Sequence, residues 1–133
     1  MPGIVYDTGA LLAAERRNRR LWVLHDEALA AGITPIVPVV VLAQAWRGGP
    51  QAELSQLLEG CHIQADDEAI GRAAGIACGV AGTSDVVDAI VMVTAIQHGA
   101  IVFTSDPEDL TYLADALSKK LTAHVVEGSQ RRC

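Results

Sequence analysis

Short apolar runs alternate along this chain with longer stretches whose apolar residues recur at helical spacing. The runs, which predict strands, lie at residues 4–6, 35–38, 61–65, 101–103 and 123–126. Stretches with apolar side chains three and four residues apart predict helices over residues 8–15, 19–31, 39–47, 51–58, 67–81, 85–97 and 107–118. Strands separated by helices are typical of a parallel sheet with helices on both faces. We therefore expect an α/β fold in a single domain that spans residues 1–133.

Three of the predicted helices begin at acidic residues. Asp7 follows the first strand, Asp85 and Asp88 open the helix at 85–97, and Asp106 and Asp109 follow the strand at 101–103. The carboxyl ends of parallel strands share one rim of the sheet, so we expect these acids to converge there. Asp88 lies one turn inside an otherwise apolar helix. Its carboxylate is therefore either buried at a considerable cost or directed into a polar cavity.

Carboxylates that converge repel one another, which raises a pKa or requires a cation. Mg²⁺ and Mn²⁺ prefer carboxylate and water oxygens, so the pattern predicts a divalent metal site. The hydroxyls of Thr104 and Ser105 would orient the residues around it. Because no serine or cysteine stands beside a histidine as a candidate nucleophile, metal-assisted hydrolysis of a phosphodiester is the chemistry that follows. An alternative is that Asp106 and Asp109 form an N-cap and N3 pair with a structural role.

Composition and charge narrow the range of functions. A formal net charge of −6 argues against binding of nucleic acid by bulk electrostatics, and two Trp, two Tyr and one Phe are too few for stacking to be the main mode of RNA binding. No apolar run approaches a membrane span and no basic leader precedes the first strand, so we expect a cytoplasmic protein. The histidines lack ligand spacing and are expected at the surface or at strand ends. Basic side chains that either contact RNA phosphates or form a solvated surface are Arg16, Arg17, Arg19, Arg20 and Arg47.

Four segments, at residues 5–11, 38–47, 85–89 and 104–110, match PIN-domain ribonucleases in order and in spacing. More narrowly, the chain resembles a VapC-type toxin of a bacterial type II toxin–antitoxin pair, of the actinobacterial sort, over essentially its whole length. The resemblance implies a PIN-like parallel sheet, Mg²⁺ or Mn²⁺ held by acids, and endonucleolytic cleavage of RNA, often tRNA or ribosomal RNA, that inhibits translation and growth. It also implies a homodimer and a small antitoxin whose C-terminal segment covers the acidic pocket.

The resemblance assigns roles to individual acids. The first, third and fourth family acids, which are catalytic and hold metal, correspond to Asp7, Asp88 and Asp106. Asp85 and Asp109 occupy positions that often supply further acidity, and the resemblance implies that they add ligands to the metal.

Gln44 departs from the family pattern, because the second family acid is usually Glu. An amide oxygen still ligates a metal or orients water, so Gln44 remains in the expected catalytic group, but it lacks the charge of a carboxylate. An alternative hypothesis follows, in which the chain is a catalytically impaired PIN-like module that binds RNA or an antitoxin.

Overall fold

The structure, a computed structural model, describes residues 2–126 and contains a five-stranded parallel sheet in that range. The strand order is β3-β2-β1-β4-β5. The strands are β1 (Ile4–Tyr6), β2 (Ile36–Pro38), β3 (His62–Gln64), β4 (Ile101–Thr104) and β5 (Thr122–Val125). Each predicted strand is present, and every pairing is parallel, as the alternation of strands and helices predicted.

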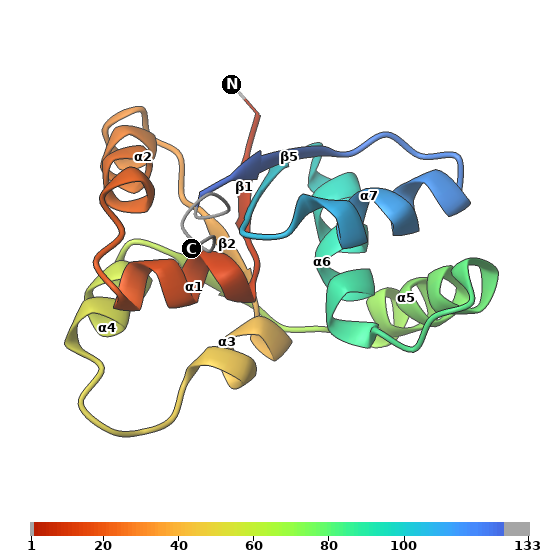
Figure 1. Cartoon of the computed structure of the whole chain (residues 1–133), viewed down its shortest axis with the longest axis horizontal. Helices are drawn as coiled ribbons and strands as arrows, with labels where there is room; N and C mark the ends of the chain where they lie inside the picture. Colours follow the sequence, from red (N-terminus) through yellow and green to blue (C-terminus); the bar gives the residue numbers. More distant parts are fainter. Residues whose placement is uncertain (1, 127–133) are drawn as a thin grey trace, which may run out of the picture.

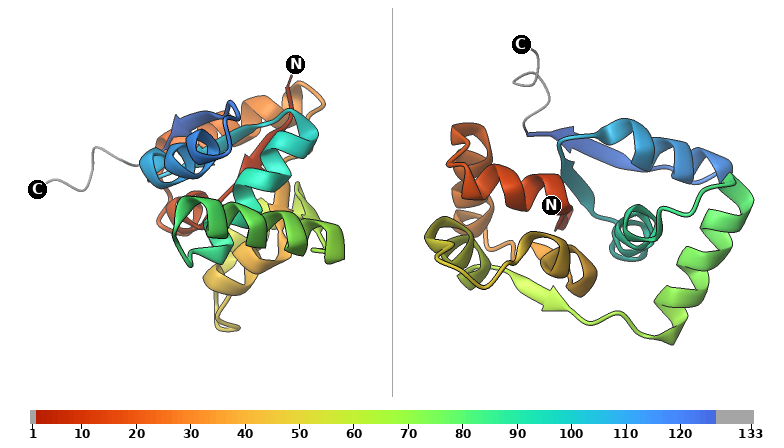
Figure 2. Two further views of the ribbon diagram at one scale, coloured as in Figure 1. Left: turned by 90° about the vertical axis from the view of Figure 1, so that its right-hand side faces the viewer. Right: turned by 60° about the horizontal axis from the view of Figure 1, so that its bottom comes forward.

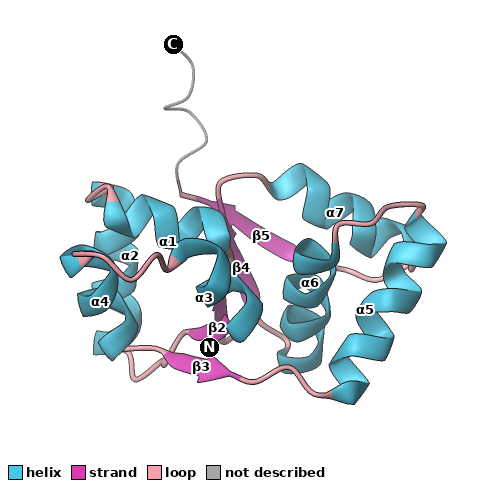
Figure 3. Ribbon diagram, turned by 90° about the horizontal axis from the view of Figure 1, so that it is seen from below, coloured by secondary structure: helices cyan, strands magenta, loops and turns pink. Residues whose placement is uncertain are grey.

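Helices cover both faces of this sheet. Figure 3 shows α1, α2 and α4 on one side and α5, α6 and α7 on the other, and the same layers can be followed in Figures 1 and 2. The helices are α1 (Thr8–Glu15), α2 (Arg19–Ala30), α3 (Val39–Ala45), α4 (Ala52–Glu59), α5 (Glu68–Ala81), α6 (Val86–His98) and α7 (Pro107–Ala116). The predicted α/β fold class is therefore confirmed.

The helix ends follow from local capping chemistry. The side chains of Asn18 and Asp67 accept hydrogen bonds from the N–H groups three residues further on, at 2.9 and 3.0 Å, which satisfies donors that a helix start leaves open. Gly82 and Gly99 end α5 and α6 with φ values of 73° and 60°, a conformation that glycine adopts without steric cost. Because these signals are local, the predicted bounds lie within two residues of the observed ones.

Strand β1 is the centre of the molecule. Its three residues are buried, and it pairs with β2 on one side and β4 on the other. Tyr6 is in register with Phe103, and the N–H of Asp7 donates to the Phe103 carbonyl at 3.2 Å. The carboxyl ends of β1 and β4 therefore lie side by side, which brings Asp7 next to the start of the β4–α7 connection.

Helix α6 is the buried helix that the sequence predicted. Ala89, Ile90, Val91 and Met92 are buried in it, and the hydroxyl of buried Thr94 donates to the Ile90 carbonyl at 2.7 Å. Among the described residues, no single helix has the length and apolar character of a membrane span, and α5 with α6 passes such a test only as a pair bent by 115°.

The expectation that all histidines lie at the surface or at strand ends is wrong for His25. This residue is 2% exposed on α2, with its Nδ1 2.7 Å from the Tyr6 hydroxyl and with Trp22 packed edge-on against its ring. Burial lowers the pKa of His25. A neutral imidazole that accepts the hydrogen bond from Tyr6 satisfies both buried groups.

Candidate metal centre

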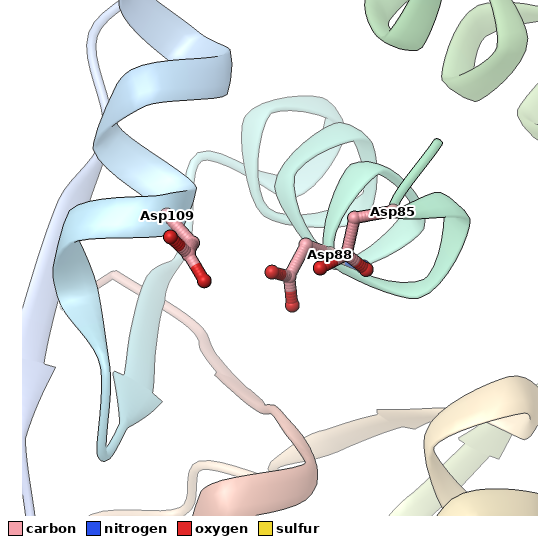
Figure 4. A group of neighbouring side chains, drawn as sticks. All are labelled: Asp85, Asp88 and Asp109. Carbon is pink, nitrogen blue, oxygen red and sulfur yellow. The ribbon is translucent and has the colours of Figure 1, made fainter. Parts of the chain in front are cut away.

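Three carboxylates lie together at the carboxyl-end rim of the sheet. One oxygen from each of Asp85, Asp88 and Asp109 lies within 4.8 Å of the other two. Figure 4 shows Asp85 and Asp88 at the start of α6 and Asp109 on α7, with the carboxylates directed into the space between the two helices. Oxygen atoms at this spacing suit the ligand shell of one divalent cation. We call Asp85, Asp88 and Asp109 the acidic triad.

Local helix structure positions each member of the triad. Asp85 is the N-cap of α6, and its side chain accepts a hydrogen bond from the Asp88 N–H at 3.3 Å. Asp109 is in the first turn of α7, which begins at Pro107, where the missing N–H of proline has no helical partner to lose. Helices α6 and α7 pack against each other. Two helix starts thus deliver the three carboxylates to one point.

Burial and mutual repulsion raise the pKa values of Asp88 and Asp109. Burial is the largest cause that raises the pKa of Asp88, to about 7, and a hydrogen bond with Asp85 and the charges of Asp85, Asp109 and Asp7 add to it. The charge of Asp106 is the largest cause that raises the pKa of Asp109. Shifts in this direction are expected for carboxylates that share a site, because protonation relieves their repulsion.

Asp7 lies deeper in the same site. It is 8% exposed and caps α1 by accepting a hydrogen bond from the Ala10 N–H at 3.0 Å. Burial raises the pKa of Asp7 to about 6, and the charge of Asp106 adds to the rise, whereas hydrogen bonds from Thr104 and from backbone N–H groups favour the charged form. Asp7 therefore interacts electrostatically with the acids around it, although it lies outside the triad.

The β4–α7 connection carries Asp106 and the residues that support it. Asp106 is exposed and makes no side-chain capping hydrogen bond, so the structural N-cap interpretation does not hold for it. The fully buried Thr104 hydroxyl accepts a hydrogen bond from the Asp106 N–H at 2.9 Å and donates one to Asp7. Ser105 packs so closely on Gly9 that a Cβ there would collide with its Oγ. Thr104 thus hydrogen-bonds to two of the predicted site residues, Asp7 and Asp106.

Gln44 lies on α3 at the Asp7 side of the rim. It is exposed, and its Oε1 accepts a hydrogen bond from the Thr8 hydroxyl at 2.5 Å. Thr8 directly follows Asp7 in the chain. The structure therefore places an amide, without a charge of its own, beside the most buried acid of the site.

The basic cluster lies at the opposite end of α1 from Asp7. An eight-residue helix is about 12 Å long, which separates the cluster from the acids by roughly that distance. Arg17 pairs with Glu53 at 2.8 Å, and Arg47 donates to two backbone carbonyls at the end of α3. The residues of the cluster, all exposed, are Arg16, Arg17, Arg19 and Arg20.

The triad opens into a recess of about 180 Å³ whose remaining walls are Thr83, Tyr112 and Leu113. Sequence reasoning missed these residues. Tyr112 follows Asp109 by three positions on one helix, and that spacing is the signal that could have found it. A larger recess of about 370 Å³ against α5 and α6 is mainly apolar and contains none of the acids. Polar chemistry, and not size, therefore identifies the candidate site.

The residues at the rim fit a hard divalent cation. The triad supplies carboxylate oxygens, the ligand class that Mg²⁺ and Mn²⁺ prefer. Between described residues, the ion pairs join Arg17 to Glu53 and Arg72 to Glu68, so neither neutralises the triad. A bound cation would remove the repulsion that raises the carboxylate pKa values.

Comparisons with known proteins agree with this fold. Among solved structures, the chain is similar to VapBC2 from Rickettsia felis bound to a DNA fragment from its promoter, at 16% identity and a TM-score of 0.69 over 92% of this chain and 97% of that one. It is similar to FitAcB from Neisseria gonorrhoeae at 16% identity and a TM-score of 0.67 (94% and 99% covered). It is also similar to PAE2754 from Pyrobaculum aerophilum, at 17% identity and a TM-score of 0.63 over 98% of this chain and 88% of that one. No curated protein sequence gives a significant match.

The family is shown by a sequence profile. The PIN domain profile matches residues 4–115, a range that contains the acidic triad, Asp7 and Asp106. PIN domains are generally nucleases, which agrees with a carboxylate site at the rim of a parallel sheet. The chain belongs to the PIN domain family.

Proposed function

We propose that this chain is a metal-dependent endoribonuclease toxin of a toxin–antitoxin pair, which hydrolyses phosphodiester bonds in RNA and so inhibits translation and growth. The substrates would be tRNA or ribosomal RNA. The observation that carries the proposal is the acidic triad with oxygens within 4.8 Å of one another, next to buried Asp7. Membership of a family of nucleases supports the same reading.

In the proposed reaction, Mg²⁺ or Mn²⁺ would be held by Asp85, Asp88 and Asp109, with Asp7 and Asp106 completing the acidic surroundings. When bound, such a cation supplies Lewis-acid chemistry at the phosphoryl group and acidifies water. The chain itself supplies geometry. The Asp85 cap fixes the start of α6, and the Thr104 hydroxyl holds the Asp7 carboxylate in place.

The arginines at the far end of α1 are proposed to contact RNA beyond the cut site. A carboxylate-lined site repels phosphates, so attraction of the substrate has to come from elsewhere on the surface. Arg16, Arg17, Arg19 and Arg20 are exposed there, and Arg47 is exposed near Gln44 on the other side of Asp7. Neutralising these residues would weaken RNA binding uniformly across sequences and reduce its salt dependence.

A small antitoxin and a second copy of the chain are the proposed protein partners. The family resemblance supports both, and the similarity to VapBC2 and FitAcB, whose names combine two components, agrees with a protein partner. An antitoxin segment with a basic side chain would suit the acids at the rim. Sedimentation of the purified chain, alone and with its antitoxin, would measure both assemblies.

The alternative function is a PIN-like binding module without cleavage. Gln44 favours it, because an uncharged amide occupies the place of a usual family acid. Its oxygen also accepts a hydrogen bond from the Thr8 hydroxyl. Under this alternative, RNA or antitoxin binds at the rim but no phosphodiester is cut.

The deciding experiment is cleavage of total tRNA and ribosomal RNA by purified, antitoxin-free protein. Reactions would contain Mg²⁺, Mn²⁺ or EDTA, and would be repeated with Asp88→Ala. Asp115→Asn, an exposed acid on the same helix as Asp109 but outside the triad, is the matched control. We expect discrete products that require metal and Asp88. Absence of cleavage by folded wild-type protein under every metal condition would favour the binding module.

A further inference from the structure

We propose that the ring of Tyr112 is a stacking platform for a nucleobase next to the phosphodiester that is cut. The proposal rests on the ribonuclease function above and adds a substrate contact to it. Tyr112 lies on α7, three residues after Asp109 and on the same side of the helix. It lines the same recess as all three carboxylates of the triad.

The Tyr112 ring is exposed but fixed in position. The residue is 59% exposed, and its hydroxyl donates a hydrogen bond to the Ala81 carbonyl at 2.7 Å. That bond joins α7 to the last residue of α5, and the two helices also pack against each other. A ring whose polar end is already satisfied keeps its apolar surface free for a ligand and loses little conformational freedom on binding.

Charge around Tyr112 favours a base over a phosphate as the ligand. Besides the triad recess, the ring lines a second recess of about 370 Å³ together with Glu108 and Asp115. Acids on both sides repel a phosphate that no cation neutralises. A nucleobase is neutral, and each of the bases has a π face that stacks on an aromatic ring. The scissile phosphate would therefore lie at the triad with its cation, and an adjacent base would lie on Tyr112.

A basic side chain of a protein partner would also suit an exposed ring, through a cation–π contact. The nucleobase is favoured because a cation held by the triad would neutralise the negative charge on that side of the ring, which weakens the attraction for such a side chain. The two ligands predict different results when Tyr112 is changed, so one experiment separates them.

The experiment compares Tyr112→Leu, which removes the ring, with Tyr112→Phe, which removes the hydrogen bond to Ala81 but keeps the ring. Ile76→Ala is the matched control, because Ile76 is 64% exposed on α5 and lines the apolar recess. The probe is a short single-stranded oligoribonucleotide in which 2-aminopurine replaces one adenine at successive positions. Its affinity and fluorescence are measured with Ca²⁺, KM and kcat for its cleavage are measured with Mg²⁺, and the affinity of each variant for the antitoxin is measured in parallel.

We expect Tyr112→Leu to bind the probe roughly five- to hundred-fold more weakly, to raise KM in proportion, and to abolish the quenching of 2-aminopurine at one position. Ile76→Ala would resemble the wild type in affinity and quenching. Tyr112→Phe would keep the quenching and lose only a small part of the affinity, because the ring remains and only the bond that fixes it is removed. Equal affinity and quenching in Tyr112→Leu and wild type would overturn the platform, as would a loss confined to antitoxin binding. A loss in Tyr112→Phe as large as in Tyr112→Leu would assign the residue a structural role and also overturn it.

The same data keep the two proposals distinguishable. Quenching that depends on Tyr112 without any cleavage would support the platform and overturn the ribonuclease. Cleavage by the wild type that Tyr112→Leu leaves unchanged would support the ribonuclease and overturn the platform. A wild-type protein that neither binds nor cleaves the probe would overturn both.

Discussion

At Asp7, stability and proposed function are opposed. Its carboxylate is buried and its pKa is raised to about 6, so the charged form destabilises the folded state at pH 7. A rise from 3.8 to about 6 corresponds to roughly 3 kcal/mol against that form. Asparagine has the same shape and still accepts the hydrogen bonds from Ala10 and Thr104. We expect Asp7→Asn to abolish cleavage and to raise the metal-free free energy of unfolding at pH 7 by about 1–3 kcal/mol.

Urea denaturation in EDTA at pH 7 measures this effect, with Asp115→Asn as the exposed control expected to change little. At pH 4 the gain in free energy of unfolding from Asp7→Asn should disappear, because Asp7 is then protonated in the folded wild type. Asp7→Asn with unchanged or lower stability at pH 7, together with full cleavage activity, would contradict both the burial argument and the assignment of Asp7 to the site.

Gln44 tests how much charge the site needs. Glutamate is nearly isosteric with glutamine and also accepts the Thr8 hydrogen bond, so Gln44→Glu changes the charge at the rim with little change in shape. We expect Mn²⁺ to bind about tenfold more tightly, measured by calorimetry. If the chain is an enzyme, cleavage is present before the substitution. If it is a binding module, cleavage begins with it. Unchanged Mn²⁺ affinity would place Gln44 outside the metal surroundings.

At the scale of elements, the site depends on how closely α1 approaches the β4–α7 connection. Gly9 lies in the first turn of α1, and a Cβ there would collide with Ser105 Oγ, one residue before Asp106. We expect Gly9→Ala to lower the free energy of unfolding by about 1–3 kcal/mol and to reduce cleavage, since relief of the clash moves Asp7 away from Asp106. Gly75→Ala, within α5, is the control: a Cβ there meets nothing within 4 Å, and the change should stabilise the helix by about 0.5–1 kcal/mol. A Gly9→Ala protein as stable and as active as the wild type would show that the approach is not required.

Elements were predictable from the sequence because their signals are local, whereas contacts between elements were not. Asp67 and Gly82 mark the two ends of α5 without reference to the rest of the chain. The burial of His25 depends on Tyr6, nineteen residues away, so no local pattern indicates it. The acids were expected to converge, but which three share one point depends on how α6 packs against α7. That Tyr112 lines the same recess also depends on the packing of α6 against α7.

At the scale of the whole molecule, titration of Asp7 and Asp88 and titration of His25 change the stability of the fold in opposite directions as the pH falls. The folded-state pKa values of Asp7 and Asp88, about 6 and about 7, lie above the value of 3.8 that represents the unfolded chain. The folded state therefore binds these protons first, and stability rises as pH falls from about 7 towards 4. The folded-state pKa of His25 is lowered instead, so the unfolded state binds that proton first, and stability is lost as pH falls below about 6.5.

A divalent cation should reverse the acidic contribution, because it binds the carboxylates only when they are deprotonated. We expect the metal-free melting temperature to rise as the pH falls from 7 to 5. The stability gained by protonating two carboxyl groups exceeds the stability lost through one histidine. In saturating Mg²⁺, the melting temperature should be higher than in EDTA at pH 7, by an amount that follows the ratio of free metal to its Kd, and this difference should shrink towards pH 5. Differential scanning fluorimetry across this range measures both curves. Asp88→Asn should remove most of the metal effect, and His25→Gln should steepen the metal-free rise, because only the acids then titrate. An Mg²⁺ shift of equal size at pH 5 and pH 7, or one that survives in Asp88→Asn, would mean that the cation binds away from these acids.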